Sequence, residues 1–248
     1  MAHPKVIANW KMNGSLSKIH HWLYEFQSKV DPNSKTESIF CPPTCYLSFA
    51  KNIISENRIG IYLGAQDLDF DRDFSLTGGI NASMLKDIGC DFIILGHSER
   101  RSYFFEDDSI LLQKLNSAVE KNLKIIFCVG ETKEEKNIGV SKEIIRTQLS
   151  ILKKIPSNLL LLAYEPLWAI GTGEVPHPEY IQEMHETIKD ELKSLNDSEI
   201  DSPVLYGGSV NEDNAPDIIK IISVDGLLVG GASLDADNFS KIVNKITG

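Results

Sequence analysis

Apolar residues recur along this chain in short continuous runs rather than in strict alternation with polar residues. Such runs are typical of parallel strands that are covered on both faces. Eight runs predict eight strands, at 5–10, 38–41, 59–65, 91–96, 123–129, 159–164, 203–206 and 226–229.

The segments between these runs carry apolar residues three and four positions apart, which is the spacing of an amphipathic helix. Ser15 stands where an N-cap would precede the first such segment, and Pro178 stands near the start of a later one. The spacing predicts eight helices, at 16–30, 46–54, 82–88, 110–119, 140–152, 181–195, 215–222 and 239–246.

Strands that alternate with helices predict right-handed crossovers and a parallel sheet, either closed into a barrel or open and doubly wound. The 248 residues match the length of about 250 that a closed (β/α)8 barrel needs. No G-x-G-x-x-G follows the first predicted strand and no P-loop pattern occurs, so we expect no nucleotide cofactor. Because no linker divides the chain, we predict one α/β domain over 1–248, with parallel strands inside and helices outside.

Composition narrows the class of protein. Hydrophobic residues make up 42% and charged residues 24%, as in ordinary globular proteins. The net charge of −10 argues against a general nucleic-acid surface. No signal-peptide pattern or membrane span of about 18 apolar residues is found, so we expect a cytoplasmic protein. The four cysteines do not suggest a disulfide framework and are interpreted as reduced thiols.

In a barrel, chemistry is located where the strands end at their carboxyl side. The first predicted strand ends in Asn9 and is followed by Lys11; the fourth is followed by His97 and Glu99; the sixth is followed by Glu165. The seventh and eighth are followed by "GGS" and "GGAS". No second histidine lies at a neighbouring strand end, so no metal site is predicted.

Each of these residues also has a purely structural interpretation. The carboxylate could be a solvated turn residue, the imidazole a helix cap, the lysine a surface charge and the glycine pairs tight turns. Arg100 and Arg101 are interpreted as ion-pair partners of Glu99 or Glu106. A functional interpretation is favoured because base, imidazole, lysine and glycine turns all face one rim.

The two glycine turns predict a phosphate site, because backbone N–H groups at a helix start bind anions without a cationic side chain. A carboxylate base beside an imidazole and a lysine fits proton abstraction next to a carbonyl group. His97, Lys11 and Asn9 could then stabilise the negative charge that develops on oxygen.

Five motifs together resemble the triosephosphate isomerase family, over residues 5 to about 246. They are "NWKMNG" (9–14), "LGHSERR" (95–101), "AYEPLWAIGTG" (163–173), "YGGSV" (206–210) and "LVGGASL" (228–234), and they occur in the order that the family has. The resemblance implies a TIM barrel that interconverts dihydroxyacetone phosphate and glyceraldehyde 3-phosphate, in glycolysis and gluconeogenesis, without a cofactor.

The resemblance also implies a role for each rim residue. Glu165 would be the base, and His97, kept neutral near a helix start as in the family's known chemistry, would polarise the carbonyl. Lys11 would offset negative charge, Asn9 would bind a substrate oxygen, and Glu99 would orient Lys11 or His97. Backbone N–H groups would bind the phosphate at Gly171, Ser209, Gly230 and Gly231.

Residues 166–176 correspond to the family's lid, which closes over the bound ligand. Closure would bring Ile170 towards Leu228 and remove water from the carboxylate, and Tyr206 and Ser209 would hold the closed lid. It would also protect the enediolate from losing its phosphate.

The loop 66–82 corresponds to the loop through which the family forms homodimers. Thr77 is retained, so its reach into a neighbour's site is still expected. Gly79 stands where the family has an acidic residue, which removes an intersubunit ion pair with Arg100, and Phe105 replaces a common glycine. We expect a homodimer.

Two other classes of function are kept open. The first is another phosphate-binding barrel enzyme, either a Schiff-base aldolase that uses Lys11 or a different sugar-phosphate isomerase. The second is a barrel that serves only as a binding module. The intact base, imidazole and lid argue against a binding module.

Overall fold

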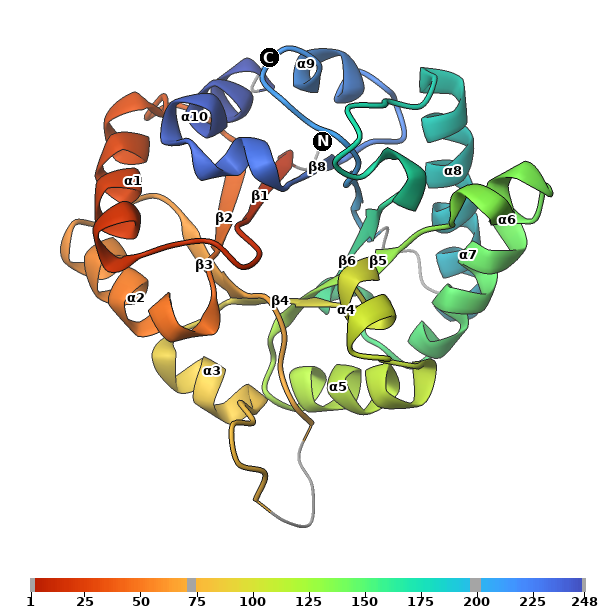
Figure 1. Ribbon diagram of the computed structural model, residues 1–248, viewed down its shortest axis with the longest axis horizontal. Coiled ribbons are helices and arrows are strands. Elements are labelled where there is room, and N and C mark those ends of the chain that lie inside the picture. Colours follow the sequence, from red (N-terminus) through yellow and green to blue (C-terminus); the bar gives the residue numbers. More distant parts are fainter. Residues whose placement is uncertain (1–2, 71–74, 197–201, 247–248) are drawn as a thin grey trace.

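The computed structural model describes residues 3–70, 75–196 and 202–246. Its strands form one closed, all-parallel barrel in sequence order, with helices arranged around the outside (Figure 1). The strands are β1 (Lys5–Asn9), β2 (Glu37–Cys41), β3 (Tyr62–Ala65), β4 (Phe92–Leu95), β5 (Lys124–Val129), β6 (Leu160–Tyr164), β7 (Val204–Tyr206) and β8 (Gly226–Val229). The (β/α)8 architecture and all eight strands predicted from the sequence are therefore confirmed.

The ring closes between the first and last strands. Lys5 of β1 pairs with Glu37 of β2 on one side and with Gly226 of β8 on the other. Since every strand runs in the same direction, their carboxyl ends meet at one rim. This closure brings residues from 9 to 231 to a common site.

Ten α-helices lie within the described residues. They are α1 (Leu16–Lys29), α2 (Leu47–Glu56), α3 (Ala82–Ile88), α4 (Ser98–Tyr103), α5 (Asp108–Glu120), α6 (Lys133–Asn137), α7 (Ser141–Leu149), α8 (Pro178–Asn196), α9 (Ala215–Ile218) and α10 (Ala236–Lys245). Short 3-10 turns are η1 (Thr44–Tyr46), η2 (Ser150–Leu152), η3 (Ser157–Leu159), η4 (Leu167–Ala169) and η5 (Gly231–Leu234).

Most helix predictions are confirmed, including the N-cap: the Ser15 side chain accepts the backbone N–H of Lys18. The prediction of a helix at 215–222 was wrong at its C-terminal end, because α9 stops at Ile218. The chain has to turn there to reach β8, and Ile222 remains 89% exposed. Helices α4 and α6 were not predicted, because polar caps and charges rather than an apolar stripe define them.

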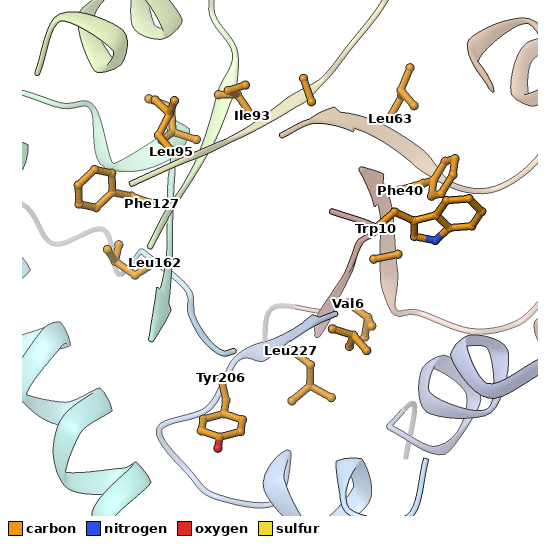
Figure 2. Packing of buried hydrophobic residues seen from close by; sticks show 14 of the residues in the cluster. Val6, Trp10, Phe40, Leu63, Ile93, Leu95, Phe127, Leu162, Tyr206 and Leu227 are labelled. Atoms are coloured by element: carbon orange, nitrogen blue, oxygen red, sulfur yellow. The ribbon is translucent and has the colours of Figure 1, made fainter. Parts of the chain in front are cut away.

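The apolar strands divide their side chains between two cores, because successive residues of a strand point to opposite faces. On β5, Ile125 and Phe127 join the outer cluster between strands and helices, and Ile126 and Cys128 join the cluster inside the barrel. Figure 2 shows part of the outer cluster, with Phe127 and Leu227 directed from the strands towards the helices. A strand buried on both faces makes a rigid mount for the residue that follows it.

Candidate active site

A cavity of about 330 Å3 opens at the carboxyl rim of the barrel. All eight residues that the sequence marked as a site line it: Asn9, Lys11, His97, Glu165, Gly171, Ser209, Gly230 and Gly231. The structure thus brings together groups that lie more than 200 residues apart in the sequence.

Glu165 follows the last residue of β6 and is only 3% exposed. Its Oε1 lies 3.2 Å from His97 Nε2, while its Oε2 is buried and has no hydrogen-bond partner among the described residues. Burial raises the pKa of Glu165, but the adjacent His97 and the ammonium of Lys11 outweigh it, so the pKa lies below its ordinary 4.5. The carboxylate is therefore ionised and poorly hydrated.

His97 is the N-cap of α4, and its Nδ1 accepts the backbone N–H of Glu99 at 3.2 Å. A nitrogen that accepts this hydrogen bond carries no proton, so the neutral ring holds its hydrogen on Nε2, facing Glu165. Burial lowers the pKa of His97 and the Glu165 carboxylate raises it, with a net upward direction from 6.5. The arrangement gives an N–H donor directed to the centre of the site.

Lys11 has a left-handed backbone with φ of 50°, and its backbone N–H donates to Asn9 Oδ1 at 3.1 Å. Its Nζ lies 2.6 Å from Glu99 Oε1. The side chain of Gln66 donates to the Lys11 carbonyl at 3.0 Å and fixes the same turn. The expected contact between Glu99 and Lys11 is thus present, and Glu99 joins the start of α4 to the end of β1.

The lid contacts the loop after β7. Ser209 Oγ donates to the carbonyl of Ala169 at 2.6 Å and accepts the N–H of Gly173 at 3.2 Å. Ile170 and Leu228 both line the cavity. The contact expected from Tyr206 is not made in this conformation, since its hydroxyl is buried without a hydrogen-bond partner among the described residues.

Two further residues near Glu165 were not singled out from the sequence. Glu131 is fully buried and accepts hydrogen bonds from the hydroxyls of Tyr164 and Tyr180 and from the Trp168 indole, the last at 2.9 Å. Its carboxylate ties β6 and α8 to the lid's near hinge. The only available signal was its place two residues after the fifth apolar run.

Gly130 is the second missed residue, and it packs against the backbone of the base. A Cβ on Gly130 would overlap the carbonyl oxygen of Glu165. Gln148 holds Gly130 from the other side, with hydrogen bonds of 2.9 Å to both its N–H and its carbonyl. A Cβ on Gly207 would come within 2.9 Å of Glu165 Cγ. Glycine at 130 and 207 therefore leaves the space that the base needs.

Arg100 of α4 is held by carboxylates of its own chain. It lies 2.8 Å from Asp67 and 2.7 Å from Glu106, and buried Lys114 contacts both acids. Burial raises the pKa of Asp67 to about 6. Asp67 was not expected in this role, whereas the expected pair of Arg100 with Glu106 is present. Arg101 pairs instead with Asp108, at 3.1 Å.

Neither a membrane-spanning helix nor a metal-binding cluster occurs within the described residues. No helix in 3–70, 75–196 or 202–246 is long and apolar enough to cross a membrane. Within the same ranges, no group of three or more His, Cys, Asp or Glu side chains could hold a metal ion. The four cysteines are free, and only Cys45 is exposed.

Comparison with known proteins agrees with this geometry. The family model described as triosephosphate isomerase matches residues 4–246. A triosephosphate isomerase of Chlamydia trachomatis serovar L2 is 42% identical over 246 residues, covering 97% of this chain and 89% of the relative. That of Neisseria meningitidis serogroup A is 42% identical over 244 residues, covering 96% of each chain. That of Aquifex aeolicus is 38% identical over 242 residues, covering 96% of this chain and 97% of the relative. The chain therefore belongs to the triosephosphate isomerase family.

Proposed function

We propose that this protein interconverts dihydroxyacetone phosphate and D-glyceraldehyde 3-phosphate by proton transfer through an enediolate. The observation that carries the proposal is the pairing of buried Glu165 with the Nε2–H of His97 across a cavity that ends in glycine turns. Family membership supports the same reaction. The closed ring of strands supports one domain over 1–248.

Glu165 is the base in this proposal. It removes a proton from the carbon next to the carbonyl, and the electron pair of that C–H bond moves to form the C1–C2 double bond of the enediolate. Glu165 lines the cavity together with His97 and Lys11, so its carboxylate is placed to take this proton. Returning the proton to the neighbouring carbon completes the isomerisation.

When substrate binds, His97 redirects its Nε2–H from Glu165 Oε1 to the carbonyl oxygen on which negative charge develops, and it moves protons between the two enediolate oxygens. Lys11 offsets the charge of substrate and intermediate, and Asn9 binds a substrate oxygen. Such donors act most strongly in a site from which water is excluded. The burial of Glu165 and His97 meets this condition.

The phosphate binds at the opposite end of the cavity, to backbone N–H groups of Gly171, Ser209, Gly230 and Gly231. A Cβ built on Gly171 or Gly231 would meet no protein atom within 4 Å, so these turns border open space. Because Gly171 belongs to the lid, phosphate binding and lid closure are linked. The closed lid retains the enediolate until its proton is returned.

We also propose that the protein is a homodimer and that it is located in the cytoplasm. Large apolar side chains are exposed after β1 and at the end of α4: Met12 at 97%, Tyr103 at 77%, Phe104 at 63% and Phe105 at 81%. Beside them lies a second cavity of about 290 Å3, bordered by Lys11 and Gln66. A second copy of this chain would fill that cavity with its own Thr77. Residues 71–74 of this loop lie outside the described residues.

A coupled assay of both directions of the triose phosphate reaction, with EDTA present as a control for contaminating metal, tests this function. Turnover of both substrates supports it, and a protein that binds phosphate esters without turnover would be a binding module instead. Borohydride treatment with dihydroxyacetone phosphate tests the aldolase alternative. We expect no covalent adduct, because Lys11 is ion-paired with Glu99 and an ammonium group does not attack a carbonyl.

A further inference from the structure

A single cation covers the ring of the tryptophan at the near hinge of the lid. Lys136 of α6 places its Nζ 3.3 Å from the ring centroid of Trp168 and 5.0 Å from that of Tyr180. Both the lysine and the tryptophan are half-buried. An ammonium this close to an aromatic face is attracted by the negative potential of the ring, and partial burial strengthens that attraction.

The helix that carries this lysine is fixed at its start. Thr132 accepts the backbone N–H of Glu135, and the Glu135 side chain accepts the N–H of Thr132 in return, at 3.2 and 2.7 Å. Such a capping box sets the direction of the first helical turn. Lys136 therefore projects from a defined position next to the lid.

The indole of Trp168 is consequently held in two different ways. Its Nε1–H donates to the buried carboxylate of Glu131, and its face is covered by the ammonium of Lys136. The Tyr180 ring packs edge-on at 6.0 Å. Trp168 lies in η4 and is followed at once by Ala169, whose carbonyl accepts the Ser209 hydroxyl. A shift of the Trp168 indole would therefore displace the neighbouring Ala169 carbonyl, through which the lid contacts Ser209.

We propose that Lys136 is a positioning residue for the isomerase reaction, which holds the near hinge through the Trp168 ring and favours the docked lid. The inference rests on the lid assigned in the proposed function. Removing the charge should lower the ratio of docked to undocked lid by about three- to tenfold, which is the factor that one such contact supplies. A hinge affects both substrate binding and the lid closure that commits the bound substrate to reaction. KM and kcat should therefore both change.

The test compares Lys136→Gln and Lys136→Met, which lack the charge, with Lys136→Arg, which keeps it. Lys133→Gln is the matched control, since Lys133 is an exposed lysine of the same helix. Each protein is labelled with 5-fluorotryptophan, and its 19F spectrum is recorded with and without 2-phosphoglycolate, whose carboxylate imitates the enediolate. The chain has three tryptophans, and buried Trp10 and Trp22, which neither Lys136 nor Lys133 contacts among the described residues, supply reference signals for comparing the free variants.

We expect the Trp168 signal of the free Gln and Met variants to shift, with weaker 2-phosphoglycolate binding and a larger fraction of substrate lost as inorganic phosphate. The Arg variant should retain wild-type behaviour, and Lys133→Gln should be unchanged. Charge-free variants with a wild-type Trp168 signal and wild-type affinity would overturn the role of Lys136. A wild-type Trp168 signal that ignores 2-phosphoglycolate would instead refute the lid of the proposed function.

Discussion

Oε1 of Glu165 lies 3.2 Å from Nε2 of His97, although β5 separates the two strands that these residues follow. The contact crosses the mouth of the barrel rather than running along one pair of strands. The two groups that carry the proposed proton transfer are thus already in contact before substrate binds.

Shortening the base is the most direct test of this geometry. Glu165→Asp withdraws the carboxylate by about one methylene, and misplacement of about 1 Å costs about 10²-fold in rate. We expect kcat to fall by about 10² to 10³, with KM within about threefold, because the role belongs to the transition state. Steady-state kinetics in both directions measure it, and full turnover by the variant would show that another group is the base.

Replacing the donor tests the opposite side of the site. His97→Gln keeps a polar side chain but loses the proton shuttle, and we expect kcat to fall by about 10² to 10³. The pKa of Glu165 should also rise, because the variant loses the Nε2–H hydrogen bond with which His97 stabilises the carboxylate. As the pH is lowered, the residual kcat/KM should therefore begin to fall at a higher pH than in the wild type. An unchanged acid limb would contradict the assigned pairing.

We expect the lid to affect the ratio of the two products more strongly than it affects the rate of proton abstraction. Deleting residues 170–173 exposes the enediolate to water, so we expect more inorganic phosphate released per isomerisation event. Phosphate and isomerised product are measured in the same reaction. Ser209→Ala, which removes only the hydroxyl that contacts the lid, should give an intermediate ratio. Equal ratios in all three proteins would rule out a protective lid.

The exposed apolar face predicts self-association. Met12 is 97% exposed, so Met12→Asp should cost the monomer little while placing a charge in the proposed interface. We expect a wild-type dimer and a folded monomeric variant in sedimentation at micromolar concentration. Ile222→Asp is the control, because Ile222 is 89% exposed away from this face. An active wild-type monomer would refute the dimer.

Buried His185 should make stability depend on pH. Burial lowers its pKa from 6.5 to about 3, so the unfolded chain takes up a proton at this residue below about pH 6.5 while the folded protein does not. Stability is therefore lost as pH falls through 6.5, by about 2 kcal/mol between pH 7 and pH 5. His185→Gln removes this dependence, whereas His20→Gln, at an exposed position, should not. Urea unfolding at both pH values measures the free energy of unfolding. If this free energy changed equally between pH 7 and pH 5 in the wild type and in His185→Gln, the prediction would be contradicted.

Strands and rim residues could be predicted because their signals are local. An apolar run reveals a strand buried on both faces, and barrel closure then places Glu165 and His97 at one rim. Helix α4 could not be found this way, because a histidine cap and the ion pairs of Arg100 stabilise it. No feature of the sequence pattern indicates that Arg100 contacts Asp67.

Glu131 and Asp67 were missed for a related reason. Both follow strands and stand near charged residues, so each resembles a solvated loop carboxylate. Only the folded chain shows that three donors converge on Glu131 and that two cations enclose Asp67. A buried acid is recognisable by its partners, which come from distant parts of the chain.

Gly130 carries no functional group, yet it borders the carbonyl of Glu165 so closely that no other residue fits. In a survey of variants scored by activity alone, position 130 would look like a reacting group. Selection would then preserve a glycine that contributes only the space left by its missing side chain. The set of positions under constraint is thus larger than the set that performs chemistry, and its additional members are found by asking what a side chain would displace.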